Sequence, residues 1–129
     1  MQTLLQRRMK HALENIERLT RDLASGTSIT TAKQLLNRTE ELPFMILSLG
    51  LGQAAAFYKT KCKNSEDSDG YGLVYNILQA WLCHEQKLFA KQTDLVDAIQ
   101  ASDISHYRIA QAEAIEYMSH LKYYAKAYF

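Results

Sequence analysis

The chain has 129 residues, which is enough for one domain that buries a core without help from metals or disulfides. Fifteen basic and fourteen acidic residues leave a formal net charge of +1, so charge-based binding to nucleic acid or a membrane would depend on local clusters. Two cysteines without a CxxC motif indicate neither a zinc site nor a disulfide scaffold and favour a reducing cytoplasm, and the absence of long apolar runs argues against export and membrane insertion.

Apolar residues near the start of the chain follow helical spacing. They recur at steps of three and four and predict one side of a helix: Leu5, Met9, Ala12, Ile16, Leu19 and Leu23. We expect this helix to end near Gly26. A second helix follows, with Thr30 or Thr31 as its N-cap. It should stop or kink at Leu42-Pro43, because proline disfavours helical geometry in the residue before it.

A third helix is predicted from Pro43 over "PFMILSLGLGQAAAFYK", since proline suits a first helical turn. The segment is apolar nearly all round, as expected of a central helix shielded by its neighbours. The "GLG" at 50–52 lies inside it and lacks the remaining residues of a phosphate-binding loop, so close helix packing explains these glycines better. Residues 63–70, "KNSEDSDG", are polar and predict the one substantial loop.

Three more helices are predicted after this loop. The fourth carries a set of apolar residues: Leu73, Val74, Ile77, Leu78, Trp81 and Leu82. Thr93 can cap a short fifth helix, and Ser105 can cap the sixth. No segment shows the sustained alternation typical of a strand. The sequence therefore predicts an all-α fold, a compact bundle of about five to six helices that forms a single domain over residues 1–129.

The last segment combines an apolar face with a basic flank. At helical spacing one face holds Tyr107, Ala110, Ala114, Met118, Leu121, Ala125 and Tyr128, with Tyr117 and Tyr124 at its edge. We expect this aromatic-rich helix to be clamped against the bundle. Arg108, Lys122 and Lys126 share one flank over about 27 Å. This stripe could follow phosphates, or it could be ordinary solvated charge.

Basic residues also gather at two other places. Arg7, Arg8 and Lys10 crowd the first turns of the first helix. Further along that helix, opposite charges stand four residues apart and are expected to pair: Lys10, Glu14 and Arg18, and Glu17 with Arg21. The basic residues from Arg7 to Lys10, at the start of this helix, are thus expected to remain without ion-pair partners. Lys59, Lys61 and Lys63 lie at the C-terminal end of the predicted third helix. Cations are favoured there because that end of the helix dipole is negative.

Catalytic and metal-binding motifs are not indicated. The four histidines stand in separate segments, and no Glu-x-x-His motif appears. His84-Glu85 lacks the second histidine of a zinc-protease helix. The "DSDG" at 67–70 lacks the closing glutamate of a calcium loop. We therefore expect no catalytic residues, no metal and no cofactor, and a protein that is not an enzyme.

Three segments, in order, resemble a known family. They are "LPFMILSLGLGQAAAFYK" (42–59), "YGLVYNILQAWL" (71–82) and "HYRIAQAEAIEYMSHLKYYAKA" (106–127). Together they are similar to the small α-helical subunit of the type III-B CRISPR effector, the Cmr complex. The resemblance covers most of the chain. Its most specific parts are the Leu-Pro followed by Gly-Leu-Gly-Gln and the Tyr-Arg, Glu-Ala, Leu-Lys and Ala series near the end.

This resemblance implies a cytoplasmic antiviral role without catalytic duty. Copies of the subunit would stack into a filament beside the backbone subunits that hold the guide RNA, and their basic surface would line the channel for target RNA. The matched basic positions are Lys59, Arg108 and Lys122, to which the clustering adds Arg7, Arg8 and Lys10. The implied partners are the other effector subunits, further copies of the chain, and guide and target RNA. Tyr124 and Tyr128 are the expected contacts between copies.

The chain also departs from the family pattern. A tryptophan is typical at position 120 and a basic residue at position 123, whereas this chain has His120 and Tyr123. These differences bear on how far the last helix contacts phosphates. Two alternatives stay open at this point: the small subunit of a type III-A effector, and a helical adaptor that binds an acidic protein and no RNA.

Overall fold

The computed structural model describes residues 1–26, 30–62, 70–89 and 94–129. Its elements are α1 (Leu4–Ser25), α2 (Ala32–Leu49), α3 (Leu51–Lys61), α4 (Tyr71–Gln79), a π-helix η1 (Ala80–Glu85), α5 (Leu95–Ala101) and α6 (Ile104–Tyr128). Every regular element within these ranges is helical, which confirms the predicted all-α class. Apart from Gly70, the predicted loop at 63–70 lies outside the described residues.

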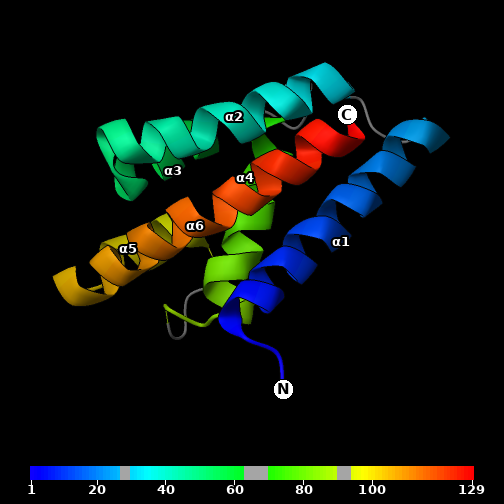
Figure 1. Ribbon diagram of the computed structural model, residues 1–129. Coiled ribbons are helices and arrows are strands. Elements are labelled where there is room, and N and C mark those ends of the chain that lie inside the picture. Colours follow the sequence, from blue (N-terminus) through cyan, green and yellow to red (C-terminus); the bar gives the residue numbers. More distant parts are fainter. Residues whose placement is uncertain (27–29, 63–69, 90–93) are drawn as a thin grey trace.

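The long helices α1, α2 and α6 lie side by side. Figure 1 shows α6 between α1 and α2, and these two helices are its main contacts. Helix α1 runs in the same direction as α6 and α2 runs in the opposite one, so the end of α6 lies near the start of α2. Helix α4 crosses behind α6 and leads into η1, which packs beside the first half of α1.

All of these helices contribute to one hydrophobic core. Its largest fully buried side chains include Ile16, Ile46, Trp81 and Tyr117. The predicted apolar face of α6 is largely confirmed, because Ala110, Ala114, Met118, Leu121 and Ala125 are completely buried. Tyr117, expected at the edge of that face, is buried as well, whereas Tyr128 is 49% exposed. The apolar face therefore ends one turn before the helix does.

The apolar side of α1 begins differently from the prediction. Leu5 and Met9 are exposed, whereas Leu4 is partly buried against the core. Counting back from the buried Ala12 in steps of four gives Arg8 and Leu4, and these two residues face the interior. The expected positions of Leu5 and Met9 were wrong because the buried side of the first two turns includes a charged residue, Arg8.

Side-chain caps define the helix starts. Thr3 and Thr31 each form a reciprocal capping box with the glutamine three residues on, which confirms Thr31 as the cap of the second helix. Gly26 ends α1 in the left-handed conformation, as predicted. The expected cap at Ser105 was wrong. Asp103 caps α6 by accepting a hydrogen bond from the backbone N–H of His106, because the helix begins one residue before Ser105.

Helix α5 also begins with an aspartate. Asp94 is its N-cap and accepts a hydrogen bond from the backbone N–H of Asp97. The predicted cap, Thr93, lies outside the described residues. Asp94 receives two further side-chain hydrogen bonds, which are described with the basic residues below.

The predicted end of the second helix at Leu42-Pro43, and the start of a third at Pro43, were wrong, because α2 continues through Pro43 as one helix. A proline inside a helix removes one backbone hydrogen bond and costs about 3 kcal/mol. Leu42 and Ile46, on either side of it, are fully buried. Burial of such side chains stabilises by roughly 1.5–3 kcal/mol each, which is enough to offset the proline.

The actual break comes at Gly50. Its φ of 89° and ψ of 159° belong to a region that is essentially restricted to glycine. The "GLG" therefore forms the junction between α2 and α3, and the prediction that it lies inside a helix was wrong. Helix α6 caps the start of α3: the backbone N–H of Leu51 donates to Gln111 (2.8 Å), and that of Gly52 donates to the Tyr107 hydroxyl (2.9 Å).

Candidate nucleic-acid interface

Arg8 is held by a carboxylate from α6. Its guanidinium donates two hydrogen bonds of 2.7 Å to the two oxygens of Glu113, which is only 9% exposed. The indole N–H of Trp81 donates to the same carboxylate at 2.9 Å. The hydrogen bond that Arg8 donates to Glu113 raises the pKa of Arg8. The expectation that Arg8 is unpaired was wrong, because its partner lies 105 positions away in the sequence.

Lys59 is also paired. Its ammonium group donates to Asp94 at 2.8 Å, and the hydroxyl of Tyr75 donates to the other oxygen of that carboxylate at 3.0 Å. Burial raises the pKa of Asp94, but hydrogen bonds from Lys59, the backbone of Asp97 and Tyr75 outweigh this effect and hold the pKa below its usual range. Lys59 therefore ties the end of α3 to the start of α5.

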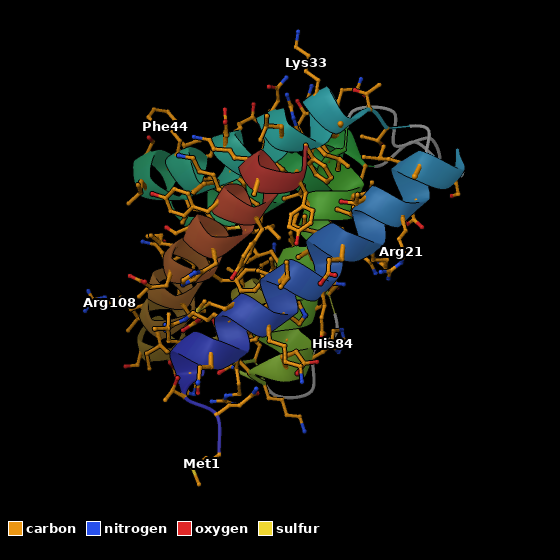
Figure 2. All side chains as sticks on the ribbon, turned by 45° about the vertical axis from the view of Figure 1, so that its right-hand side comes forward. Met1, Arg21, Lys33, Phe44, His84 and Arg108 are labelled. Carbon is orange, nitrogen blue, oxygen red and sulfur yellow. The ribbon has the colours of Figure 1, made fainter. Side chains whose placement is uncertain are left out.

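Four of the six predicted basic residues make no ion pair among the described residues: Arg7, Lys10, Arg108 and Lys122. The first three are exposed and Lys122 is half-buried. Figure 2 shows Arg108 pointing away from the molecule at the start of α6. Lys122 lies fourteen residues further on, about 21 Å along the helix and on a similar side of it. Lys126, the third residue of the predicted stripe, pairs weakly with Glu40 of α2 at 3.8 Å.

The expected pairing within α1 was wrong. In the part of the chain that the structure describes, no ion pair joins Lys10 to Glu14, Glu14 to Arg18 or Glu17 to Arg21. Such exposed pairs are worth only a few tenths of a kcal/mol, which does not outweigh the entropy of their side chains. Lys10, Arg18 and Arg21 therefore carry charge that no ion pair neutralises among the described residues.

Arg7 and Lys10 stand at a cavity that sequence reasoning missed. It measures about 300 Å³ and lies between α1 and η1. Its lining comes from three short segments of the chain: Gln2, Arg7, Lys10, His11, Glu14, Trp81, Glu85 and Gln86. The π-helical turn brings Trp81 and Glu85 to the same wall, and local π-helical geometry is common at functional sites. We call this the α1–η1 pocket.

Three aromatic rings pack beneath the α1–η1 pocket. Trp81 stacks on Tyr117 with a centroid distance of 5.0 Å and an interplanar angle of 15°. The imidazole of His11 lies 5.2 Å from Trp81 and 5.4 Å from Tyr117. Trp81 and Tyr117 are buried and His11 is half-buried. His11 and Trp81 line the pocket, and His11 is the more exposed of the two rings.

Hydrogen bonds determine which nitrogen of His11 carries the proton. The side-chain N–H of Asn15 donates to the His11 carbonyl at 2.8 Å, and the same nitrogen lies 3.3 Å from His11 Nδ1. An N–H at Nδ1 would face the side-chain N–H2 of Asn15, so we assign Nδ1 as an acceptor whose single lone pair takes the O–H of Tyr117. Burial lowers the pKa of His11 and raises that of Tyr117, which keeps the imidazole neutral and the phenol protonated. The proton of His11 is therefore on Nε2.

The described residues contain no group of three or more His, Cys, Asp or Glu side chains that could hold a metal ion. None of the helices in these ranges is long and apolar enough to cross a membrane. The fold and surface thus define a small all-α protein with exposed cations on two of its long helices and a polar pocket beside one of them.

Comparison with known proteins gives the family. The family described as CRISPR-associated protein (Cas_Cmr5) matches residues 4–128. The chain therefore belongs to this family, the small helical subunit of the type III-B CRISPR effector. No curated protein matches the chain. The resemblance stated from three sequence segments is confirmed, and the type III-B assignment is favoured over the type III-A alternative.

Proposed function

We propose that this protein is a non-catalytic subunit whose copies stack into a short filament in the type III-B effector and help to hold the duplex of guide and target RNA. The observation that carries the proposal is the family match over residues 4–128. It is supported by the four cations that make no ion pair among the described residues: Arg7, Lys10, Arg108 and Lys122.

In this proposal these four cations bind phosphate groups of the RNA. An exposed guanidinium or ammonium group without a carboxylate partner can bind an RNA phosphate without first breaking an ion pair. Arg8 and Lys59 do not have this freedom, so we leave them out of the proposed RNA surface and assign them to stability. Sequence reasoning could not separate the two groups, because Glu113 and Asp94 are distant in the chain.

Assembly of several copies supplies most of the affinity for RNA. The net charge of +1 and the few free cations predict weak RNA binding by a single copy. Copies held in a row would act together on one RNA, since each later contact forms at a high effective concentration. Cleavage of target RNA is assigned to other subunits of the complex, and this protein contributes binding surface and contacts between copies.

The test is reconstitution of the effector with a triple variant, Arg7→Ala, Lys10→Ala and Arg108→Ala. The matched control removes two arginines and one lysine that are also exposed, Arg18, Arg21 and Lys33, and Figure 2 shows the last two away from Arg108. Lys122 is left intact because it is half-buried. Target-RNA affinity is measured against salt concentration, and complex composition is measured by mass.

Both complexes should assemble. The triple variant should bind target RNA more weakly, and its salt slope should be smaller by about 0.7 for each phosphate that a copy no longer binds. The control should keep the slope of the unmodified complex. Equal slopes for both variants in intact complexes would reject the RNA role, and failure of the unmodified protein to join the complex would reject the role as a subunit.

A further inference from the structure

The α1–η1 pocket has walls of mixed charge that a simple ion does not fit. Glu14 and Glu85 disfavour a free anion, and Arg7 and Lys10 disfavour a free cation. A ligand that carries an anionic group at one end and hydrogen-bond donors at the other satisfies both kinds of wall. A nucleotide has this arrangement, because its phosphate accepts from cations and its base edge presents N–H groups.

The volume of the pocket limits how much of the nucleic acid can enter. About 300 Å³ is at the small end for ligand pockets and leaves room for one base with its sugar at the mouth. A paired duplex presents its base edges only within its grooves. The occupant is therefore an unpaired nucleotide, as is usual where proteins read bases in RNA.

The polar groups of the wall favour one base. His11 carries its proton on Nε2, which has no hydrogen-bond partner among the described residues and so can donate to a base oxygen. The carboxylate of Glu85 lines the same pocket as the imidazole of His11, from the side of η1. A donor beside a carboxylate matches the Watson–Crick edge of guanine, where O6 accepts and N1–H and N2–H donate side by side. Uracil offers only one N–H between two carbonyls.

We infer that the α1–η1 pocket binds an unpaired guanine nucleotide of the bound RNA, with the phosphate on Arg7 and Lys10, O6 on His11 Nε2 and the two N–H groups on Glu85. This inference rests on the proposed RNA-binding function and adds a base-specific contact to it. Burial of the rings beneath His11 pre-organises the site, because the hydrogen bond from Tyr117 holds the imidazole in place.

The test uses the only tryptophan of the chain as a reporter. Trp81 lines the pocket, and its indole N–H gives one resonance in the NMR spectrum of the full-length protein. The probes are GMP, UMP and two short RNAs: an oligouridine with one central guanosine, and the same oligomer with uridine there. A good bidentate base contact discriminates by about tenfold or more. GMP and the guanosine-containing RNA should therefore shift the indole resonance at concentrations about tenfold lower than their uracil counterparts.

Variants separate base recognition from phosphate attraction. Glu85→Gln should abolish the preference for guanine, so that GMP and UMP bind with equal affinity. Glu17→Gln, an exposed carboxylate on α1 that does not line the pocket, should leave the preference intact. Equal affinity for GMP and UMP in the unmodified protein would overturn the inference. Binding of GMP without binding of the guanosine-containing RNA would overturn it too, because the occupant would then be a free nucleotide.

Failure here can be told apart from failure of the proposed function. If the pocket shows no guanine preference but the Arg7, Lys10 and Arg108 triple variant still weakens target binding by the complex, the base-specific contact is wrong and the RNA role stands. If guanine binds selectively but the triple variant leaves target binding unchanged, the pocket stands as a nucleotide site and the proposed contact with target RNA is wrong.

Discussion

Glu113 connects three helical elements through one buried carboxylate. It accepts two hydrogen bonds from Arg8 of α1 and one from Trp81 of η1. Glu113→Ala would leave a mostly buried guanidinium without its counter-charge and an indole N–H without an acceptor. We expect the free energy of unfolding to fall by about 3 kcal/mol. Urea denaturation measures this.

The control for that prediction is Glu17→Ala, an exposed residue on α1 without an ion pair among the described residues. It should change stability by less than about 0.5 kcal/mol. A loss for Glu113→Ala no larger than the control's would mean that the Arg8 ion pair adds nothing beyond the cost of removing its groups from water.

His11 makes stability depend on pH. Burial lowers its pKa below the ordinary value of 6.5, although Glu85 and Glu14 act in the opposite direction. The unfolded chain therefore takes up a proton at this residue more readily than the folded protein does. Stability should be unaffected by His11 well above pH 6.5 and should decline as the pH falls below it, until the folded protein is protonated too.

Chemical denaturation across pH 5 to 8 measures this dependence. His11→Asn keeps an acceptor for the Tyr117 hydroxyl and does not titrate, so it should flatten the curve below about pH 6.5. His84→Asn, which replaces an exposed histidine outside the aromatic cluster, is the matched control for the substitution. The same steepness in the wild type and in His11→Asn would show that another group is responsible.

The junction of α2 and α3 depends on the absence of a side chain at Gly50. A methyl group there would lie 3.1 Å from the Tyr107 hydroxyl and would occupy a backbone region that other residues avoid. We expect Gly50→Ala to cost about 2 to 3 kcal/mol. Gly26→Ala is the matched control, because Gly26 also has a positive φ but has no neighbour within 4 Å of an added methyl group. It should cost about 1 kcal/mol.

Thermal or urea unfolding of both variants measures the two costs. The difference between them combines crowding against Tyr107, which also holds the start of α3, with the greater strain of the backbone region that Gly50 occupies. Equal costs would mean that neither effect adds to the ordinary cost of a positive φ and that Tyr107 moves aside freely.

Local signals in the sequence predicted much of the helical structure. The spacing of Ala110, Ala114, Met118, Leu121 and Ala125 indicated the buried face of α6, and Thr31 and Gly26 marked helix ends, because these depend on residues a few positions apart. Pro43 indicated the wrong break, since the cost of a proline is local but the burial that offsets it is tertiary. The Arg8–Glu113 pair and the α1–η1 pocket had no local signal at all, because their parts come from distant segments.

At the scale of the whole molecule, the end of α6 offers two tyrosines with different surroundings. Tyr124 is partly buried and packs against the core, whereas Tyr128 is 49% exposed on the last turn. The expectation that both contact a neighbouring copy therefore divides into two cases. Tyr124 contributes to the stability of its own chain. Tyr128 is the better candidate for a contact between copies in the proposed filament.

We therefore expect Tyr124→Ala and Tyr128→Ala to act on different equilibria. Tyr124→Ala should lower the free energy of unfolding by about 2 kcal/mol, since it removes part of the core. Tyr128→Ala should leave unfolding nearly unchanged but weaken assembly by about tenfold or more, as removal of an aromatic interface residue does. Tyr123→Ala, which removes a 67% exposed tyrosine from the same helix, is the control and should change neither quantity. Normal assembly of a fully folded Tyr128→Ala protein would exclude the end of α6 from the interface, and copies would then have to meet through another surface.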